Sequence, residues 1–186
     1  MPARTLYTVG HSTRSSEELL EILREAGVEL VADVRAFPSS RRHPQFNQGA
    51  LADWLAAAGI GYRHMPGLGG RRSPVAGSPN GGWHERAFQG YADHMRSQEF
   101  QAAVAELEAG ARVTPTAIMC AEAVWWRCHR RLIADVLVAT GWRVEHLGIE
   151  GRASVHELSD FAVVGPDGSL TYPPAQQTLP HLIDDR

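Results

Sequence analysis

The most reactive segment of the sequence runs from residue 120 to residue 131 and reads CAEAVWWRCHRR. It holds both cysteines of the chain, together with a glutamate, a histidine and three arginines. A thiol at a helix N-terminus beside histidine and arginine has a lowered pKa and can act as a nucleophile. Cys128 fits this description better than Cys120, which ends an apolar run and also suits a small buried position. Both cysteines are therefore candidate nucleophiles.

Known cysteine loops do not match this segment. Cysteine-dependent phosphatases have five residues between cysteine and arginine, and Arg127 comes one residue too late after Cys120. Rhodanese-like sulfurtransferases wrap a reactive cysteine in backbone amides, but residues 121–127 contain no glycine and two tryptophans. Cys120, Cys128 and His129 are metal-ligand types, yet the usual paired spacings are missing. We therefore expect no metal and no other cofactor.

Histidine and carboxylate side chains supply the acid–base candidates. His11 follows the first apolar run, and His129 lies next to Cys128. Asp33 ends a second apolar run, and Glu122 lies two residues after Cys120; each can orient a histidine, act as a base or pair with nearby arginines. The candidate catalytic residues are His11, Asp33, Cys120, Glu122, Cys128 and His129.

Arginines gather in the same parts of the chain. Nine of the 18 arginines lie in or beside the segments that follow the predicted strands. Guanidinium groups bind phosphate or carboxylate in a bidentate manner, and a helix N-terminus adds backbone donors. The pattern predicts a phosphate or nucleic-acid site, although some arginines can instead pair with Asp33 and Glu122. The candidate ligand-binding residues are Ser12, Arg35, Ser39, Arg41, Arg71 and Arg130.

Strands and helices alternate along the chain and must position these residues. Apolar runs predict strands at residues 6–9, 30–34, 62–65, 117–120 and 142–147. Periodic apolar residues predict helices after Ser15, after Asn47, over 84–109 with a break near Ser97, and over 130–140. The turn residues 165–168 predict a C-terminal hairpin. This order favours a three-layer α/β sandwich with a mainly parallel sheet and helices on both faces.

Length and composition limit the class of protein. The 186 residues suit one domain, which we expect over 1–172, followed by a loosely ordered tail over 173–186. The formal charge of -3 excludes a generally basic nucleic-acid coat protein. Every cation among the 18 is arginine, which is typical of a GC-rich genome. With no signal peptide, long apolar run or disulfide framework, we expect a cytoplasmic protein that does not enter membranes.

Several short motifs together resemble the DUF488 family, a bacterial and archaeal family named for having no known function. The resemblance covers roughly residues 5–150, and it implies an α/β fold with a motif-lined pocket but no particular reaction. Between the cysteine motifs, where members usually carry an acidic residue and proline, this chain has residues 124–126, VWW. The motifs are Gly10-His11-Ser12, Asp33-Val34-Arg35 with Pro38-Ser39, Leu68-Gly69-Gly70, and Cys120-Ala121-Glu122 followed by Cys128-His129-Arg130.

We predict a pocket that binds, and processes, a phosphate-bearing small molecule or nucleic acid. In this interpretation Arg35, Arg41 and Arg130, with Arg71, hold the anion, and replacing Arg130 weakens binding with little change in stability. A non-catalytic nucleic-acid-binding module is the first alternative, and its affinity falls steeply with salt. Redox or sulfur-transfer chemistry of the cysteines is the second. The sequence leaves the oligomeric state open.

Overall fold

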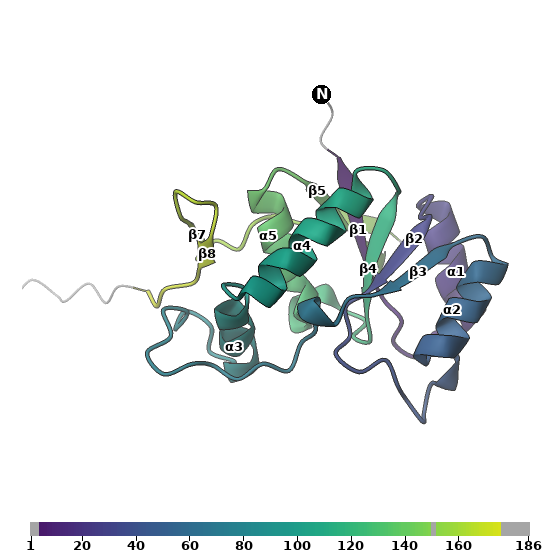
Figure 1. The fold of residues 1–186 in the computed structure, drawn as a ribbon, viewed down its shortest axis with the longest axis horizontal. Coiled ribbons are helices and arrows are strands. Elements are labelled where there is room, and N and C mark those ends of the chain that lie inside the picture. Colours follow the sequence, from purple (N-terminus) through teal and green to yellow (C-terminus); the bar gives the residue numbers. More distant parts are fainter. Residues whose placement is uncertain (1–3, 150–151, 176–186) are drawn as a thin grey trace, which may run out of the picture.

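The computed structural model describes residues 4–149 and 152–175 and confirms a mixed α/β fold (Figure 1). Five strands are parallel, and the sixth, β6, pairs with β5 in the antiparallel direction. The apolar runs predicted the parallel strands, whereas β6 was missed because it is short and three of its residues are exposed. The strands, in the sheet order β3-β2-β4-β1-β5-β6, are β1 (Thr5–Gly10), β2 (Leu30–Asp33), β3 (Gly61–His64), β4 (Thr116–Cys120), β5 (Arg143–Ile149) and β6 (Arg152–Val155).

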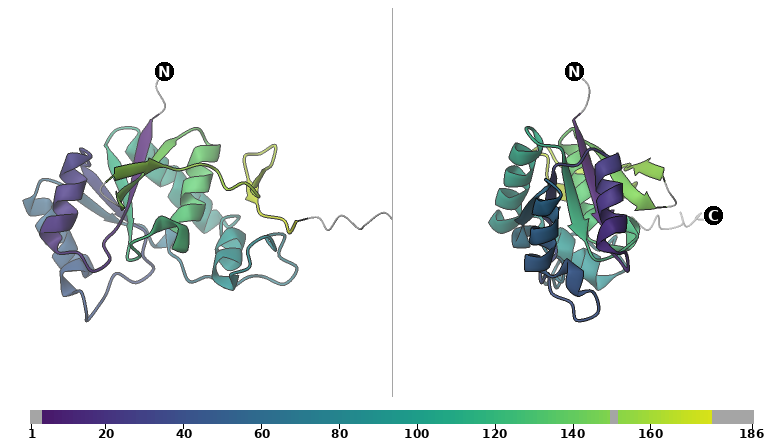
Figure 2. Two further views of the ribbon diagram at one scale, coloured as in Figure 1. Left: turned by 180° about the vertical axis from the view of Figure 1, so that it is seen from behind. Right: turned by 90° about the vertical axis from the view of Figure 1, so that its right-hand side faces the viewer.

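Helices cover both faces of this sheet, as the predicted three-layer arrangement requires (Figure 2). Two pack on one face: α1 (Ser16–Glu25) and α2 (Gln48–Ala57). The core on the other face includes residues of α3 (Arg86–His94), α4 (Gln98–Ala111) and α5 (Arg130–Ala139). The predicted hairpin is present as β7 (Val163–Val164) and β8 (Leu170–Thr171), and short 3₁₀ turns are η1 (Pro44–Phe46), η2 (Pro66–Leu68) and η3 (Trp125–Arg127).

The central strand β4 shows why the sequence forms three layers. All five of its residues are buried, and alternate side chains point to opposite faces. Ala117 and Met119 join the core under α1 and α2, while Ile118 and Cys120 join the core under α4 and α5. A strand covered on both faces needs a continuous apolar run, and this is what the sequence shows.

Local signals place the helix ends. Ser15 accepts a hydrogen bond from the Glu18 amide, and the Glu18 carboxylate accepts one from the Ser15 amide, so the expected capping box is present. Ser97 caps α4 and separates it from α3. Asn47 stands at the N-cap of α2, but its side chain binds the Ser40 amide instead of the helix. The Asn47 side chain, which we expected to cap α2, therefore stabilises the loop that precedes the helix.

The chain reverses its direction across the sheet at β4, and this determines where a ligand site can form. The helices that follow β1 and β2 lie on one face, whereas the helix that follows β4 lies on the other face. Strand β4 lies between β1 and β2 in the sheet. At the carboxyl end of β4, its own loop therefore turns to one face of the sheet, while the loops after β1 and β2 turn to the other face. Open α/β sheets bind ligands in the crevice at such a switch point.

The predictions of no membrane-spanning segment and of a loosely ordered C-terminal tail can be compared with the described residues. None of the helices described is both long enough and apolar enough to span a bilayer. Most of the predicted C-terminal tail, residues 176–186, lies outside the described residues.

Candidate functional site

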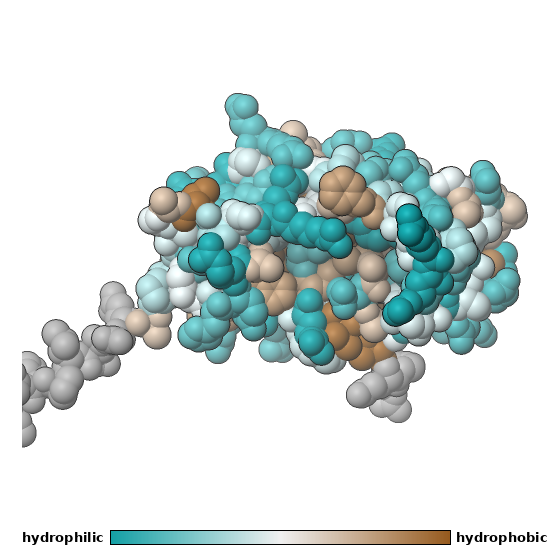
Figure 3. All heavy atoms as spheres, turned by 90° about the horizontal axis from the view of Figure 1, so that it is seen from below, coloured by the Kyte–Doolittle hydropathy of each residue, from teal (hydrophilic) through white to brown (hydrophobic). Residues whose placement is uncertain are grey.

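A cleft of about 380 Å³ lies at the carboxyl ends of β2 and β4. Seen from below, toward the edge where these strands end, apolar surface in the middle of the face is bordered by hydrophilic side chains (Figure 3). Three arginines, one glutamate, both cysteines and a histidine provide the polar groups of the cleft, and aromatic rings provide much of the rest. The lining residues are Arg35–Phe37, Gly70, Arg71, Ala87, Phe88, Tyr91, Cys120–Glu122 and Arg127–His129.

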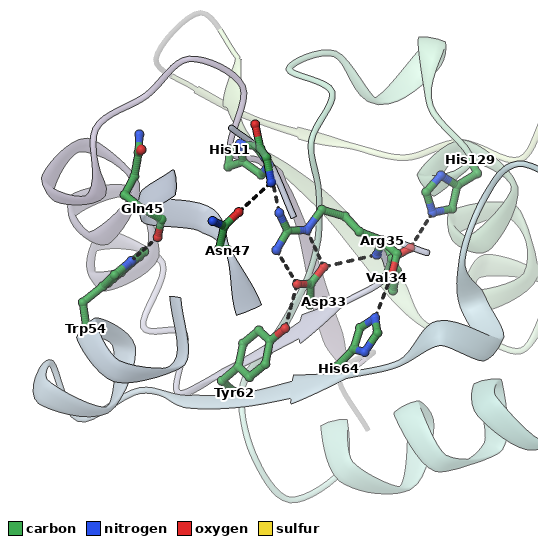
Figure 4. A network of polar contacts seen from close by, with 11 residues as sticks. His11, Asp33, Val34, Arg35, Gln45, Asn47, Trp54, Tyr62, His64 and His129 are labelled. Carbon is green, nitrogen blue, oxygen red and sulfur yellow. Dashed lines mark hydrogen bonds and ion pairs between the residues drawn. The ribbon is translucent and has the colours of Figure 1, made fainter. Parts of the chain in front are cut away.

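A buried ion pair holds Arg35 at one wall of the cleft (Figure 4). The guanidinium donates from Nε and Nη2 to the two carboxylate oxygens of Asp33, at 2.8 and 2.6 Å, and Tyr62 donates a third bond to that carboxylate. Arg35 Nη1 lies 3.3 Å from His11 Nε2, which must accept because a guanidinium can only donate. Burial lowers the pKa of His11 to about 4, in agreement with a neutral ring. Asp33 thus orients an arginine, with a neutral histidine behind it.

Two further histidines hold the backbone that follows β2. His64 Nε2 donates to the Arg35 carbonyl at 2.9 Å, and His129 Nε2 donates to the Val34 carbonyl at 2.9 Å (Figure 4). A carbonyl oxygen only accepts, so each ring carries its proton on Nε2. The Nδ1 atom of a neutral His129 therefore has a free lone pair.

Both cysteines face that lone pair. His129 Nδ1 lies 3.6 Å from Cys128 Sγ and 4.0 Å from Cys120 Sγ, and the two thiols are 3% and 6% exposed, respectively. A hydrogen bond from the Cys120 thiol, followed by the nearby Arg130 charge, lowers the pKa of Cys128. The same hydrogen bond, with burial, raises the pKa of Cys120. The pair thus consists of a more acidic thiol, Cys128, and a less acidic one, Cys120.

Arg130 supports the loop between the two cysteines instead of facing the cleft. Its side chain is fully buried, and Nη2 donates to the carbonyls of Glu122 and Ala123 while Nη1 donates to Thr8 Oγ1. Gly10 passes directly under this loop, where an added Cβ would meet the Glu122 carbonyl. Since no part of Arg130 is exposed, it cannot hold a ligand in the cleft as we had expected. Its role is to hold the loop in place.

Glycines explain the third motif of the sequence. A Cβ on Gly69 would come within 2.9 Å of the Ala36 backbone, and one on Gly70 within 2.9 Å of the His129 ring. Tyr91 also packs against that ring, at 5.1 Å between centroids, and donates to the Leu68 carbonyl. The motif therefore brings a loop close enough to lock the His129 side chain. A pair of adjacent glycines in a long loop signals such close approach, although it does not reveal the partner.

A chain of hydrogen bonds behind the cleft was not foreseen. Arg130 donates to Thr8 (3.3 Å), Thr8 to His146 (2.7 Å), His146 to His156 (3.0 Å) and His156 to Asp135 (2.8 Å). In this direction each histidine accepts a hydrogen bond at Nδ1 and donates one from Nε2, which requires only one proton on each ring, so both histidines are neutral. The chain thereby connects a buried cation to a buried carboxylate through uncharged groups. No spacing in the sequence joins these residues, because they come from four separate strands, helices and loops.

Protonation of His146, within this chain of hydrogen bonds, is expected to destabilise the fold. Burial lowers the pKa of His146 from 6.5 to about 3, and the positive charge of the nearby Arg130 acts in the same direction. Protons then bind the unfolded chain more tightly, so the free energy of unfolding falls as the pH drops below 6.5. We expect His146 to account for a loss of about 2 kcal/mol between about pH 7 and pH 5. Urea unfolding of the wild type and of His146→Gln at both pH values measures this loss. If the free energy of unfolding fell equally in the two proteins, the role of His146 would be contradicted.

The structure brings together only part of the predicted site. Of the candidate catalytic residues, Cys120, Glu122, Cys128 and His129 line the cleft, while His11 and Asp33 stand behind Arg35. Of the candidate ligand-binding residues, Arg35 and Arg71 line it. The other four, which do not, are Ser12, Ser39, Arg41 and Arg130. Four further residues that line the cleft were not among the candidate site residues. Arg127 immediately precedes Cys128 and Phe37 lies between Arg35 and Ser39, whereas Phe88 and Tyr91 belong to α3.

These features define an α/β protein whose site, lined by arginine, cysteine and histidine, lies at the switch point of a mainly parallel sheet. The chain belongs to the DUF488 family, since the family model described as "Domain of unknown function DUF488" matches residues 15–137. The matched range includes the motifs from Asp33 to Arg130, whereas Gly10-His11-Ser12 precedes it. No curated protein and no solved structure matches the chain. The family resemblance inferred from the motifs is confirmed.

Proposed function

We propose that the cleft binds and processes a small phosphate-bearing molecule with an aromatic part, of which a nucleotide is the simplest example. One observation carries this proposal: exposed arginines and aromatic rings share one cleft. Within residues 4–149 and 152–175, neither Arg71 nor Arg127 forms an ion pair. Both are therefore available to an anion, whereas Arg35 is already paired with Asp33.

The aromatic rings suit the remainder of such a ligand. Phe37, which is 75% exposed, and the half-buried Phe88 both line the cleft. An exposed phenylalanine beside arginines offers a stacking surface for a nucleobase. The cleft volume of about 380 Å³ is in the range of small-molecule sites. Reactive groups on Cys120, Cys128 and His129 line the same cleft, and this favours processing over binding alone.

The backbone of Arg71 supports its assignment to the ligand. Its φ of 63° lies in the left-handed region, which costs about 1–2 kcal/mol for a residue with a side chain. Strain of this kind is common where a residue is held for a ligand. The strain also offers a useful variant, because Arg71→Gly removes the charge and relieves the strain together.

Removing the unpaired charges is expected to weaken phosphate binding about 10- to 100-fold, since a charge-assisted hydrogen bond contributes about 1.5–3 kcal/mol. Calorimetric titration of pyrophosphate and AMP into Arg71→Gly and Arg127→Gln measures this effect. Arg63→Gln is the control, because Arg63 is exposed and paired with Glu106 away from the cleft. Equal affinities in all the proteins would exclude the assignment.

A second variant separates the two parts of the ligand. Phe37→Ala is expected to weaken AMP binding while leaving pyrophosphate binding unchanged.

A nucleic-acid-binding module would instead prefer a single-stranded oligonucleotide over AMP and lose affinity steeply with salt. We retain the cytoplasm as the predicted compartment, where free thiols such as Cys120 and Cys128 persist.

A further inference from the structure

Three ligand atoms of metal-binding type converge at the cleft. Cys120 Sγ, Cys128 Sγ and His129 Nδ1 all lie within 4.8 Å of one another. The two nitrogen–sulfur distances are 3.6 and 4.0 Å. Tetrahedral zinc bonds of roughly 2.3 Å to sulfur and 2.0 Å to nitrogen imply nitrogen–sulfur separations of about 3.5 Å. The same geometry needs the two sulfurs about 3.8 Å apart. They lie at most 4.8 Å apart, so a zinc ion fits between the three atoms if the sulfurs close by up to about 1 Å.

His129 is already oriented as a ligand. Metal-binding histidines usually donate their second ring N–H to a carbonyl or carboxylate, and His129 Nε2 donates to the Val34 carbonyl. This bond leaves the Nδ1 lone pair directed toward the sulfurs. Gly70 and Tyr91 both pack against the ring: a Cβ on Gly70 would meet it at 2.9 Å, and the Tyr91 ring lies 5.1 Å away between centroids. Binding would therefore require little reorganisation of the ring.

We propose that Cys120, Cys128 and His129 form a site for a divalent metal of the zinc class. Two thiolates and one imidazole are soft and borderline ligands, which favour zinc over magnesium or calcium. Two thiolates balance the charge of a divalent cation, so the complete site is neutral. This matters because both cysteines are buried, and two unneutralised thiolates would be costly there.

All three ligands line the cleft, so a fourth ligand would reach the metal from the cleft. Within the described residues, no other histidine, cysteine or carboxylate joins the three ligands. Structural zinc sites usually have four protein ligands, whereas sites with three keep one position for water or a substrate atom. Glu122 lines the same cleft and is exposed. The metal site depends on the three side chains alone and does not require the proposed nucleotide binding.

Cobalt(II) provides the direct test, because it reports its ligands by absorption. The full-length protein, reduced and freed of metal, is titrated with Co²⁺ and then with Zn²⁺. We expect one equivalent to bind, with a thiolate-to-cobalt charge-transfer band and strong visible bands typical of four-coordinate cobalt, and Zn²⁺ to displace it. Added imidazole is expected to shift the visible bands; bands that stay unchanged would overturn the open fourth position.

Variants then test the three ligands individually. Cys120→Ser, Cys128→Ser and His129→Asn are each expected to weaken Co²⁺ binding by more than about 100-fold, which exceeds the usual effect of an outer-shell partner. His64→Asn is the matched control, since His64 makes the same kind of bond to the Arg35 carbonyl but lies outside the cluster. Its affinity for Co²⁺ is expected to equal that of the wild type. Circular dichroism verifies that each variant is folded.

Other outcomes would overturn the metal site. Absence of a charge-transfer band in the reduced wild type would exclude it, as would wild-type affinity in folded His129→Asn. A Cys120–Cys128 disulfide in the untreated protein, with no metal bound after reduction, would indicate a redox pair instead. Arg71→Gly and Arg127→Gln are expected to bind Co²⁺ normally, so a failure of the proposed phosphate binding can be told apart from a failure of the metal site.

Discussion

Gly10→Ala is expected to lower the free energy of unfolding by about 3 kcal/mol or more, or to prevent folding. The added Cβ would lie 1.8 Å from the Glu122 carbonyl oxygen and 2.9 Å from Arg130 Nη2. The nearer atom belongs to the backbone, so it cannot move aside as the end of a flexible side chain can. Relief of the clash requires β1 and the loop after β4 to separate, and this also disturbs the cleft.

Denaturant unfolding of the purified variant measures this loss, and Gly49→Ala is the matched control. Gly49 lies in α2, and a Cβ there would meet no atom within 4 Å. Alanine is preferred over glycine in helices, so Gly49→Ala is expected to stabilise the protein by about 0.5–1 kcal/mol. A stability loss for Gly10→Ala below about 1 kcal/mol would show that the strand and loop do not approach as closely as described.

Arg130→Met is expected to cost about 3–5 kcal/mol of stability, because breaking a buried charged network leaves its partners uncompensated. The loop carbonyls of Glu122 and Ala123 lose their donor, and the hydrogen-bond chain that ends at Asp135 loses its cation. This reverses the expectation from sequence that removal of Arg130 would affect binding and spare stability. The difference arises because the side chain is fully buried.

The adjacent arginine is the control for this effect. Arg131 is only half-buried, donates to Ser159 and stacks on Trp83 at 4.8 Å. Arg131→Met keeps most of the apolar contact, so we expect it to cost about 1 kcal/mol. Thermal and denaturant unfolding of both variants distinguish the two arginines. Similar losses for Arg130→Met and Arg131→Met would contradict the supporting role that we assign to Arg130.

The site could be predicted by region better than by residue. The segments that follow β2 and β4 were chosen because parallel strands end at one edge, and the cleft is indeed lined by both. Individual arginines were harder, since a guanidinium can pair with a carboxylate, bind a backbone carbonyl or remain available to a ligand. Arg35, Arg130 and Arg71 show these three outcomes. Which one occurs depends on contacts with residues far away in the chain.

The metal-ligand cluster illustrates the same limit. Cys120 and Cys128 do not have the close spacing by which metal-binding pairs are usually found in sequence, and we therefore predicted no metal. In the fold, Cys120 ends β4 while Cys128 and His129 precede α5, so the loop between them returns both to the strand end. A spacing rule describes ligands within a short turn, and it does not detect residues that a longer loop brings back together.

The sequence by itself determined the layers, most of the strands and helices, the capping of α1 and the edge of the sheet where reactive residues gather. These follow from local periodicity and from the right-handed connection of parallel strands, which depend little on distant residues. Only the tertiary structure decided that Arg130 is buried, that Arg71 and Arg127 face the cleft, and that two thiols meet one imidazole. Such contacts join segments far apart in the chain, and side-chain packing, which no local pattern encodes, selects among them.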